Sequence, residues 1–372
     1  MISRRVERGL HVVTRTCPTH TESFITATAM DGEPDRAPFE RLAGLIEDHQ
    51  AAVVSQEVFG PVASHESCLA PFGEVAWPVT WIQEAQQAAP AVAGTQVWAV
   101  AGTPVRSLDL GGNIVGRVFF EGATQVCRLG ALAPERRDRP SGDQAQEVFQ
   151  QMDAALAAAD MTFADVVRTW FFNHDILEWY SDFNRVRQAF FEAHEVFDGL
   201  VPASTGMGGC NGSAAALTGA LLALRSEDKR VRAEAVPSPL QSPALEYGSA
   251  FSRAVEVAMP DHRRLFVSGT ASISPEGDTL HVGDVDAQIA RTMDVARAIL
   301  ESRGMGWHDV TRAIVYFKRA ADRPRFAAYA AQRGLPPLPV VVVANDVCRD
   351  DLLFEIELDA LRASAGHGEG QC

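Results

Sequence analysis

The stretch VCRDDLLFEIELDA, residues 347–360, places three carboxylates at every second position of an otherwise apolar segment. In a β-strand successive side chains point to opposite faces, so one face of this strand is apolar and the other is acidic. The acidic face carries Glu355, Glu357 and Asp359. Two interpretations follow from this pattern. Either the acidic face is exposed to solvent, or one of the carboxylates lines a cavity and transfers protons.

The segment that leads to this strand repeats an earlier part of the chain. Residues 145–172 align with residues 287–317 when small gaps are allowed, and each copy contains Ala-Gln, Met-Asp and Asp-Val-x-Arg in that order. In each copy the apolar residues first recur at helical spacing and then alternate as in a strand. Strands precede the first helix, and a second helix and a final strand follow. This order predicts α+β modules, each a mixed sheet with two helices on one face.

The repeat divides the chain into an earlier module at residues 95–228 and a later module at residues 247–363. Residues 229–246 contain three prolines and are predicted to be a linker, and residues 364–372 are predicted to be a tail. Residues 1–94 contain one plausible helix and one plausible strand. They are interpreted either as a degenerate third copy or as a lid.

Composition and charge exclude several classes of function. The 372 residues carry a formal net charge of −15 without a basic stripe, which argues against nucleic-acid binding. No apolar run approaches the roughly 18 residues of a membrane span, and the N-terminus lacks a signal-peptide core, so a cytoplasmic protein is expected. The six cysteines form no CxxC pair and the ten histidines form no HExxH motif, so neither a metal nor a cofactor is predicted.

The segment Phe354-Glu355-Ile356-Glu357 resembles the final strand of the RidA (YjgF) superfamily, which reads hydrophobic-Glu-Ile-Glu. The resemblance covers roughly residues 95–363 and implies chorismate-mutase-like modules. It also implies a trimer, or in a tandem chain an intramolecular pseudo-trimer, with clefts between neighbouring modules. Members that hydrolyse imines and enamines carry an arginine near the start of the preceding strand. Residues 336–343 read PPLPVVVV there, and this departure disfavours a simple deaminase.

The chorismatases, tandem relatives that cleave chorismate to pyruvate and a ring product, are more similar. The similarity runs through the chain as several dispersed segments in the same order. These segments are VRTW (167–170), YSDF (180–183), VPASTGMGG (201–209), Tyr247-Gly248, Phe251-Ser252-Arg253-Ala254, RLFVSGTASI (264–273), LHVGDV (280–285) and CRDDLLFEIE (348–357).

This resemblance implies catalytic roles for two residues. Glu355 corresponds to the catalytic acid of the chorismatases. The position of Cys348 is alanine in members that release a dihydroxycyclohexadiene and cysteine in members that form 3-hydroxybenzoate. The resemblance therefore implies an enzyme that produces pyruvate and 3-hydroxybenzoate. From the residue alone, a buried cysteine is equally well explained as a small hydrophobic side chain.

The chemistry of chorismate agrees with these residue types. Cleavage starts with protonation of the enolpyruvyl methylene carbon, which requires a carboxylic acid that is still protonated near neutral pH. Burial raises the pKa of a carboxyl group, and Glu355 lies between two large apolar residues. After it donates its proton, the same group stabilises the oxocarbenium ion and then acts as the base for water.

The remaining site residues are predicted to bind a small carboxylate substrate. Arg253 is expected to bind one substrate carboxylate, although a surface position would also explain an arginine there. Gly269, Thr270 and Ala271 are expected to permit close approach of the backbone, and His281 is expected to contact the ring hydroxyl unless it is merely structural. Tyr247 and Phe251 are predicted to lie next to the substrate. Glu357 is predicted to be either a second carboxylate of the site or the partner of an arginine. Tyr180 and the aromatic residues around Trp170 are predicted to be core or interface residues.

Two other functions remain open on the sequence alone. A RidA-type imine, enamine or other small-molecule C–N or enol hydrolase would keep Glu355 in place but use another group to bind the anion. A non-catalytic ligand-binding or chaperone-like protein would carry Glu355 paired at the surface. An RNA-cleaving function is disfavoured by the net charge of −15.

Overall fold

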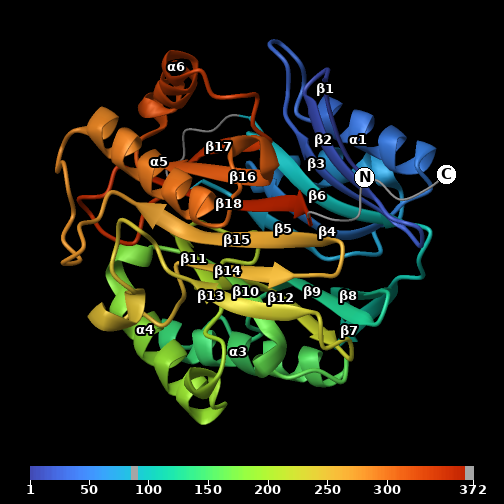
Figure 1. Ribbon diagram of the computed structural model, residues 1–372, viewed down its shortest axis with the longest axis horizontal. Helices are drawn as coiled ribbons and strands as arrows, with labels where there is room; N and C mark the ends of the chain where they lie inside the picture. Colours follow the sequence, from blue (N-terminus) through green and yellow to red (C-terminus); the bar gives the residue numbers. More distant parts are fainter. Residues whose placement is uncertain (85–90, 365–372) are drawn as a thin grey trace.

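The computed structural model describes residues 1–84 and 91–364, without the side chain of Tyr247. Within these residues the chain forms three mixed sheets of six strands, each accompanied by helices (Figure 1). The predicted α+β class with mixed sheets is therefore confirmed. Among the described residues, no helix combines the length and the apolar content that a membrane crossing requires.

The first sheet has the strand order β1-β2-β3-β6-β4-β5. Its elements are β1 (Ile2–Glu7), β2 (Leu10–Thr16), β3 (Thr21–Ala27), α1 (Ala37–Asp48), β4 (Ala52–Phe59), α2 (His65–Leu69), β5 (Val79–Ile82) and β6 (Gly94–Ala101).

The second sheet repeats this plan with the order β11-β10-β12-β9-β8-β7. Its elements are β7 (Arg106–Leu110), β8 (Asn113–Glu121), β9 (Thr124–Leu132), α3 (Ser141–Ala157), β10 (Val166–Asn173), α4 (Ile176–Ala193), β11 (Ala203–Gly208) and β12 (Leu217–Ser226).

The third sheet has the order β13-β14-β15-β18-β16-β17. Its elements are β13 (Arg232–Val236), β14 (Ala254–Ala258), β15 (His262–Ala271), α5 (Val285–Ser302), β16 (Val310–Phe317), α6 (Pro324–Arg333), β17 (Val340–Ala344) and β18 (Phe354–Ala363).

Each sheet contains one parallel pair at its edge, and the connection explains it. The pairs β4/β5, β10/β11 and β16/β17 are parallel, whereas the other neighbouring strands are antiparallel. A parallel pair needs a crossover connection rather than a tight turn, and the three connections pass through α2, α4 and α6.

Strand pairing differs from the predicted domain boundaries at two places. Residues 94–101 form β6, which pairs with β3 and β4 of the first sheet and does not belong with residues 102–228. Residues 232–236, predicted to be linker, form β13 and pair with β14. Because β13 is an edge strand with exposed charged side chains, its sequence lacks the apolar alternation of a strand. Residues 2–101 share the strand plan of the other two sheets, which favours a third copy over a lid.

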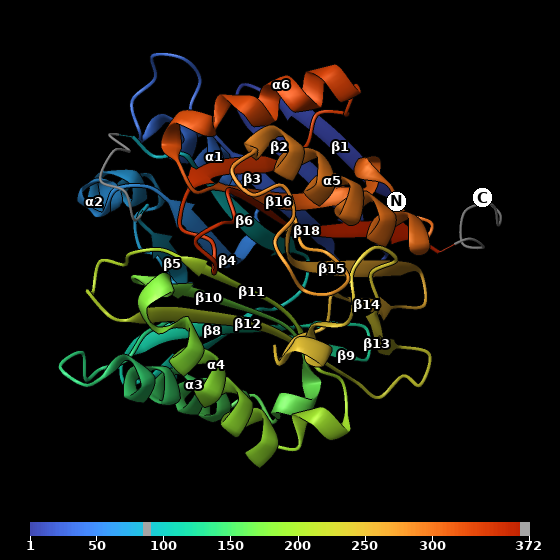
Figure 2. The ribbon, with the colours of Figure 1, turned by 90° about the vertical axis from the view of Figure 1, so that its left-hand side faces the viewer.

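The helices lie on the outside of the molecule and the sheets lie inside (Figures 1 and 2). Helices α1, α3 and α5 pack on the outer faces of the first, second and third sheets. The inner faces of all three sheets share one apolar core. It includes Trp98 of β6, Trp170 of β10 and Ile314 of β16.

Substitution of a core phenylalanine tests the packing of α3 and α4 on the second sheet. Phe171 is 0% exposed, and its ring centroid lies 5.2 Å from that of Phe149 and 5.0 Å from that of Phe183. We expect Phe171→Ala to lower the free energy of unfolding by about 3–5 kcal/mol, because it leaves a cavity among these rings. Urea denaturation followed by circular dichroism measures this change.

The matched control is Phe120→Ala, because Phe120 is 55% exposed. It should change the free energy of unfolding by less than about 0.5 kcal/mol. Equal effects of the two substitutions would contradict the described packing.

Candidate active site

The acidic face of β18 is buried. Glu355 is 5% exposed and Glu357 is 0% exposed, and the side chain of Asp359 is 13% exposed. The apolar face of the same strand packs against the residues of α5, so the carboxylates point toward the other sheets. The interpretation of a solvent-exposed acidic face is therefore wrong.

Glu357 is held as an anion by two arginines. Its carboxylate accepts a hydrogen bond of 2.7 Å from Arg168 of β10 and one of 2.9 Å from Arg312 of β16. Burial alone would raise the pKa of Glu357, but Arg312 and Arg168 lower it below its ordinary value. The guanidinium of Arg168 also lies 4.6 Å from the ring of Trp170. Because Arg168 belongs to the second sheet and Glu357 to the third, this ion pair joins the two sheets.

Glu355 has the opposite electrostatic character. Burial raises its pKa to about 8, and the negative charge of Glu357 adds to this increase. Arg168 and Arg253 act in the other direction but do not cancel it. Glu355 is therefore largely a neutral carboxylic acid at neutral pH, whereas Glu357 on the same strand is a carboxylate. A carboxyl group that stays protonated at neutral pH can act as a general acid.

Glu355 lines a cavity between the second and third sheets. The second sheet and its helix α4 contribute one side, and β15, β18 and the loops beside them contribute the other. The lining residues are Tyr180, Arg187, Ser204, Gly206, Ser249, Phe251, Arg253, Gly269, Ala271, Ile273, Cys348, Arg349 and Glu355.

Gly269 is required by the position of the Glu355 carboxyl group. A Cβ atom at residue 269 would overlap Oε1 of Glu355. The backbone N–H of Gly269 donates a hydrogen bond of 3.1 Å to Oγ1 of Thr205 on β11. A larger side chain at residue 269 would displace the carboxyl group from the cavity, so this glycine positions Glu355.

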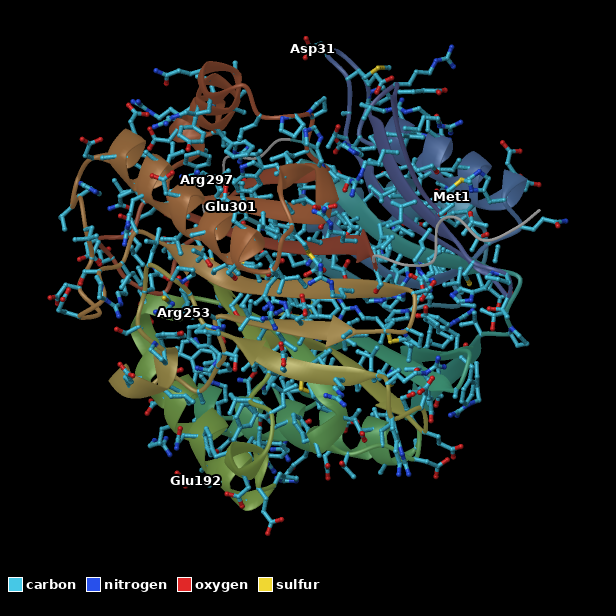
Figure 3. The ribbon with its side chains drawn as sticks, in the orientation of Figure 1. Met1, Asp31, Glu192, Arg253, Arg297 and Glu301 are labelled. Atoms are coloured by element: carbon cyan, nitrogen blue, oxygen red, sulfur yellow. The ribbon has the colours of Figure 1, made fainter. Side chains whose placement is uncertain are left out.

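Arg253 lies in the cavity wall and not at the surface. It is 4% exposed, its Nε donates to the carbonyl of Ser242 at 3.0 Å, and its guanidinium lies 5.6 Å from the ring of Phe251. Figure 3 shows Arg253 where the loops of the third sheet meet the helical part of the second module. Arg187 of α4 and Arg349 line the same cavity. Three guanidinium groups around a neutral acid favour an anionic ligand.

Cys348 and Tyr180 are neutral groups of this cavity. Burial, together with the nearby Glu355, raises the pKa of the Cys348 thiol to about 12. Burial and the nearby Cys348 also raise the pKa of Tyr180. A thiol with so high a pKa is a poor nucleophile at neutral pH. Cys348 is therefore a neutral thiol in the cavity wall.

Among the predicted site residues whose side chains are described, three do not line the cavity. Glu357 is occupied by its two arginines, and Thr270 is buried with its hydroxyl donating to the carbonyl of Ser268 at 2.9 Å. His281 is exposed in the loop before α5, has a left-handed backbone (φ 57°) and does not line the cavity. The prediction that His281 contacts a ring hydroxyl is not supported by this position. The side chain of Tyr247 lies outside the described part of the structure.

The sequence reasoning missed the side of the cavity that α4 and β11 supply. Tyr180 was expected to be a core or interface residue, and Arg187 was not considered. Both lie in a module that precedes the acidic strand by more than a hundred residues, so no local pattern connects them to Glu355. The signal that could have found them is the pair of dispersed segments at 180–183 and 201–209.

The equivalent positions in the other two sheets carry no carboxyl group. The strand pairs β4/β6, β10/β12 and β16/β18 each contain a bulge near the start of the first strand, and superposing these bulges aligns the residues of the three pairs. In this alignment Glu355, which pairs with Tyr316, corresponds to Gly94 of β6 and Thr218 of β12. Of these three aligned positions, only the one on β18 can supply a general acid.

Comparisons with known proteins agree with the tandem architecture. The sequence model of the family described as Endoribonuclease L-PSP matches residues 131–208 and 243–362. A chorismatase from Streptomyces rapamycinicus is 32% identical over 218 residues, which cover 52% of this chain and 64% of that protein. A 3-hydroxybenzoate synthase from Streptomyces hygroscopicus is 31% identical over 222 residues, covering 52% of this chain and 63% of that protein. The chain thus matches less than two thirds of the length of these curated relatives.

A solved structure shares the fold over most of the chain. The crystal structure of a chorismatase superposes with a TM-score of 0.62 and 21% sequence identity, and the alignment covers 91% of this chain and 98% of that one. At this identity the likeness establishes the fold only. The prediction of a tandem RidA-like fold is confirmed.

Removal of the buried carboxylate tests the ion pair between the sheets. Glu357→Gln would leave Arg168 and Arg312 buried without their shared counter-ion. We expect a loss of about 3–5 kcal/mol in the free energy of unfolding, measured by urea denaturation.

Glu40→Gln is the matched control, because Glu40 pairs with Arg36 at the surface with both side chains at least 50% exposed. Its expected effect is below about 0.5 kcal/mol. If Glu357→Gln changed the free energy of unfolding as little as this control, the ion pair would not be what holds the two sheets together.

Proposed function

The chain belongs to the endoribonuclease L-PSP family, also called RidA, and we propose that within this family it is a chorismatase-like enzyme. The proposed reaction cleaves the enolpyruvyl ether of chorismate and releases pyruvate and 3-hydroxybenzoate. The observation that carries the proposal is the buried Glu355, whose pKa of about 8 keeps it protonated in a cavity lined by three arginines. The similarity to curated chorismatases supports the choice of substrate.

The first step is a proton transfer from Glu355 to the enolpyruvyl methylene carbon. A new C–H bond forms, and the enol ether becomes an oxocarbenium ion. The Glu355 carboxylate that remains stabilises this cation and then accepts a proton from the attacking water. In the resulting hemiketal the bond between the former enolpyruvyl carbon and the ether oxygen breaks. The ring keeps this oxygen and takes the proton that Glu355 accepted, while the hemiketal hydroxyl returns its proton to Glu355, which yields pyruvate and a dihydroxycyclohexadiene carboxylate. Formation of 3-hydroxybenzoate additionally requires the ring to lose one water, so the overall conversion consumes no water.

The arginines of the cavity match a substrate with two carboxylates. Arg253 belongs to the third module, whereas Arg187 comes from α4 of the second, so the two guanidinium groups approach from different sides of the cleft. Arg349 follows Cys348 in the chain and lines the same cavity. Guanidinium binds carboxylate through paired hydrogen bonds, and two such contacts would orient the substrate over Glu355. Solvent screens charges less in this buried setting than at the surface, so the attraction between the guanidinium groups and the substrate carboxylates would be stronger here.

Cys348 is proposed to direct the fate of the ring. Its thiol is neutral and lies in the same cavity as Glu355. A polar but uncharged group at this position can retain the ring intermediate until it aromatises. The similarity to a 3-hydroxybenzoate synthase supports the aromatic product.

The other two functions explain these features less well. An imine or enamine hydrolase of this family would be expected to carry an arginine at the start of β17, where the chain has only apolar residues and prolines from residue 335 to 343. A non-catalytic protein would be expected to pair Glu355 at the surface, whereas Glu355 is 5% exposed.

Replacement of the acid tests the proposal directly. We expect Glu355→Gln to lower the rate of pyruvate release from chorismate by at least about 100-fold, because Gln has the same shape but no proton to donate. In the wild type, kcat/KM should stay constant below pH 8 and fall as the pH rises above about 8, because the protonated acid is the active form. A coupled pyruvate assay over a pH series measures both.

Glu301→Gln on the exposed face of α5 is the control and should retain full activity (Figure 3). Undiminished pyruvate release by a folded Glu355→Gln variant would exclude Glu355 as the acid. A folded wild type that releases no pyruvate from chorismate would exclude the chorismatase proposal.

Replacement of Cys348 tests the proposed product. We expect Cys348→Ala to keep pyruvate release within about tenfold of the wild type, because Glu355 remains in place. The ring product should shift from 3-hydroxybenzoate toward the dihydroxycyclohexadiene carboxylate, as measured by chromatography. Cys210→Ala, which is outside the cavity, should leave the product ratio unchanged. An unchanged ratio in Cys348→Ala would show that Cys348 does not decide the product.

A further inference from the structure

The turn between β2 and β3 carries Cys17 and His20, and Glu22 follows on β3. Sγ of Cys17 lies 3.1 Å from Nδ1 of His20, and Nε2 of His20 lies 3.3 Å from Oε1 of Glu22. A nucleophile, a base within hydrogen-bond distance and a third group that orients the base are the signature of an activated thiol. None of these three residues lines the cavity at Glu355.

Glu22 is fixed as an anion by its surroundings. It is 0% exposed, and Nη2 of Arg264 on β15 donates to both of its oxygens, at 2.7 and 2.9 Å. Burial would raise the pKa of Glu22, but Arg264, the hydrogen bond with His20 and Arg15 lower it well below the usual range. A carboxylate that is held in this way keeps its charge at every physiological pH and orients the imidazole.

The charge of Glu22 favours the protonated form of His20. Burial would lower the pKa of His20, but the hydrogen bond and charge of Glu22 raise it above the ordinary value, helped by Cys17 and Glu121. The nearest opposing cation is Arg15, whose Nη2 lies 3.5 Å from Nε2 of His20. Arg15 also pairs with Glu121 and Asp261, so its charge is largely compensated.

Cys17 differs from the other described cysteines in its environment. It is partly exposed, next to exposed Pro18 and Thr19. Burial would raise the pKa of its thiol, but hydrogen bonds from Thr19 and His20 and the charge of His20 lower it. Cys210 is also partly exposed, yet burial and two nearby aspartates raise its pKa. Burial likewise raises the pKa of Cys68, Cys127 and Cys348.

We propose that Cys17 is a modification site, at which a thiolate paired with the His20 imidazolium reacts with low-molecular-weight disulfides. The thiolate attacks one sulfur of the small disulfide, a new S–S bond forms to Cys17, and the S–S bond of the reagent breaks. The departing thiolate takes the proton of the His20 imidazolium, which becomes neutral. Cys17 is thereby oxidised to a mixed disulfide and the released half of the reagent is reduced to a thiol. This site is independent of the proposed enzymatic function.

The rate of modification at Cys17 relative to Cys210 tests the proposal in one molecule. The full-length protein is exposed to limiting iodoacetamide or to glutathione disulfide, and the adducts on both cysteines are quantified by peptide mass spectrometry. At pH 7 we expect Cys17 to react at least about 10-fold faster than Cys210 with either reagent. The pH at which the Cys17 rate rises should be lower than that of Cys210, because the thiolate of Cys17 is stabilised by His20 and Thr19.

Three variants test whether His20 increases the reactivity of the Cys17 thiol or only supports the fold around it. His20→Asn should lower the Cys17 rate at pH 7 by about 10-fold and move its rise to higher pH, toward that of an ordinary cysteine. His174→Asn, at an exposed histidine beside Asp175, should leave the Cys17 rate unchanged. Cys17→Ser should abolish the glutathione adduct at this peptide and retain the wild-type circular dichroism spectrum.

The proposal is overturned if wild-type Cys17 reacts no faster than Cys210, since this comparison needs no variant. It is also overturned if a folded His20→Asn protein keeps both the wild-type rate and the wild-type pH profile at Cys17. If His20→Asn does not fold, His20→Gln is measured in its place and the same two outcomes decide.

Discussion

The ion pair between Glu357 of β18 and Arg168 of β10 sets both the geometry and the electrostatics of the candidate site. It joins the third sheet to the second with a hydrogen bond of 2.7 Å between fully buried groups. The cavity is formed where these two sheets meet, so its shape depends on this contact. The same pair keeps a negative charge on Glu357, which helps to raise the pKa of Glu355 two residues away. One buried interaction thus positions the acid and favours its protonated form.

The fusion of three modules in one chain allows the clefts to differ. In an assembly of identical subunits, every cleft would carry the same residues. Here the three sheets share strand order and bulge positions, yet only β18 carries a glutamate where β6 has Gly94 and β12 has Thr218. The wall that faces Glu355 is equally specific, because Tyr180 and Arg187 come from α4 of the second module. Of the three aligned positions, therefore, only the one on β18 places a carboxyl group in such a cavity.

Much of the fold could be predicted from the sequence, whereas contacts between modules could not. The alternation around Glu355 and the internal repeat predicted the strands and the mixed sheets, because periodicity reports which side chains share a face. Arg168 is 189 positions before Glu357, so the ion pair leaves no local pattern. Strand β13 was not predicted, because an exposed edge strand with charged side chains has the same sequence pattern as a linker. The position of His281 outside the cavity wall could not be predicted either, because residue type does not reveal whether a loop histidine lines a cavity. The roles assigned to Glu355, Cys348 and Arg253 stay predictions that rest on their shared position in one cavity.

Direct titration of the Glu355 carboxyl group tests the central claim, that this acid is protonated near neutral pH. Infrared difference spectra of the wild type minus Glu355→Gln, recorded over a pH series, isolate the C=O band of this one group. The structure predicts that the band of the protonated acid is present at neutral pH and disappears with a midpoint near pH 8. A midpoint near the ordinary glutamate pKa of about 4.3 would contradict it, because Glu355 would then be a carboxylate with no proton to donate at neutral pH.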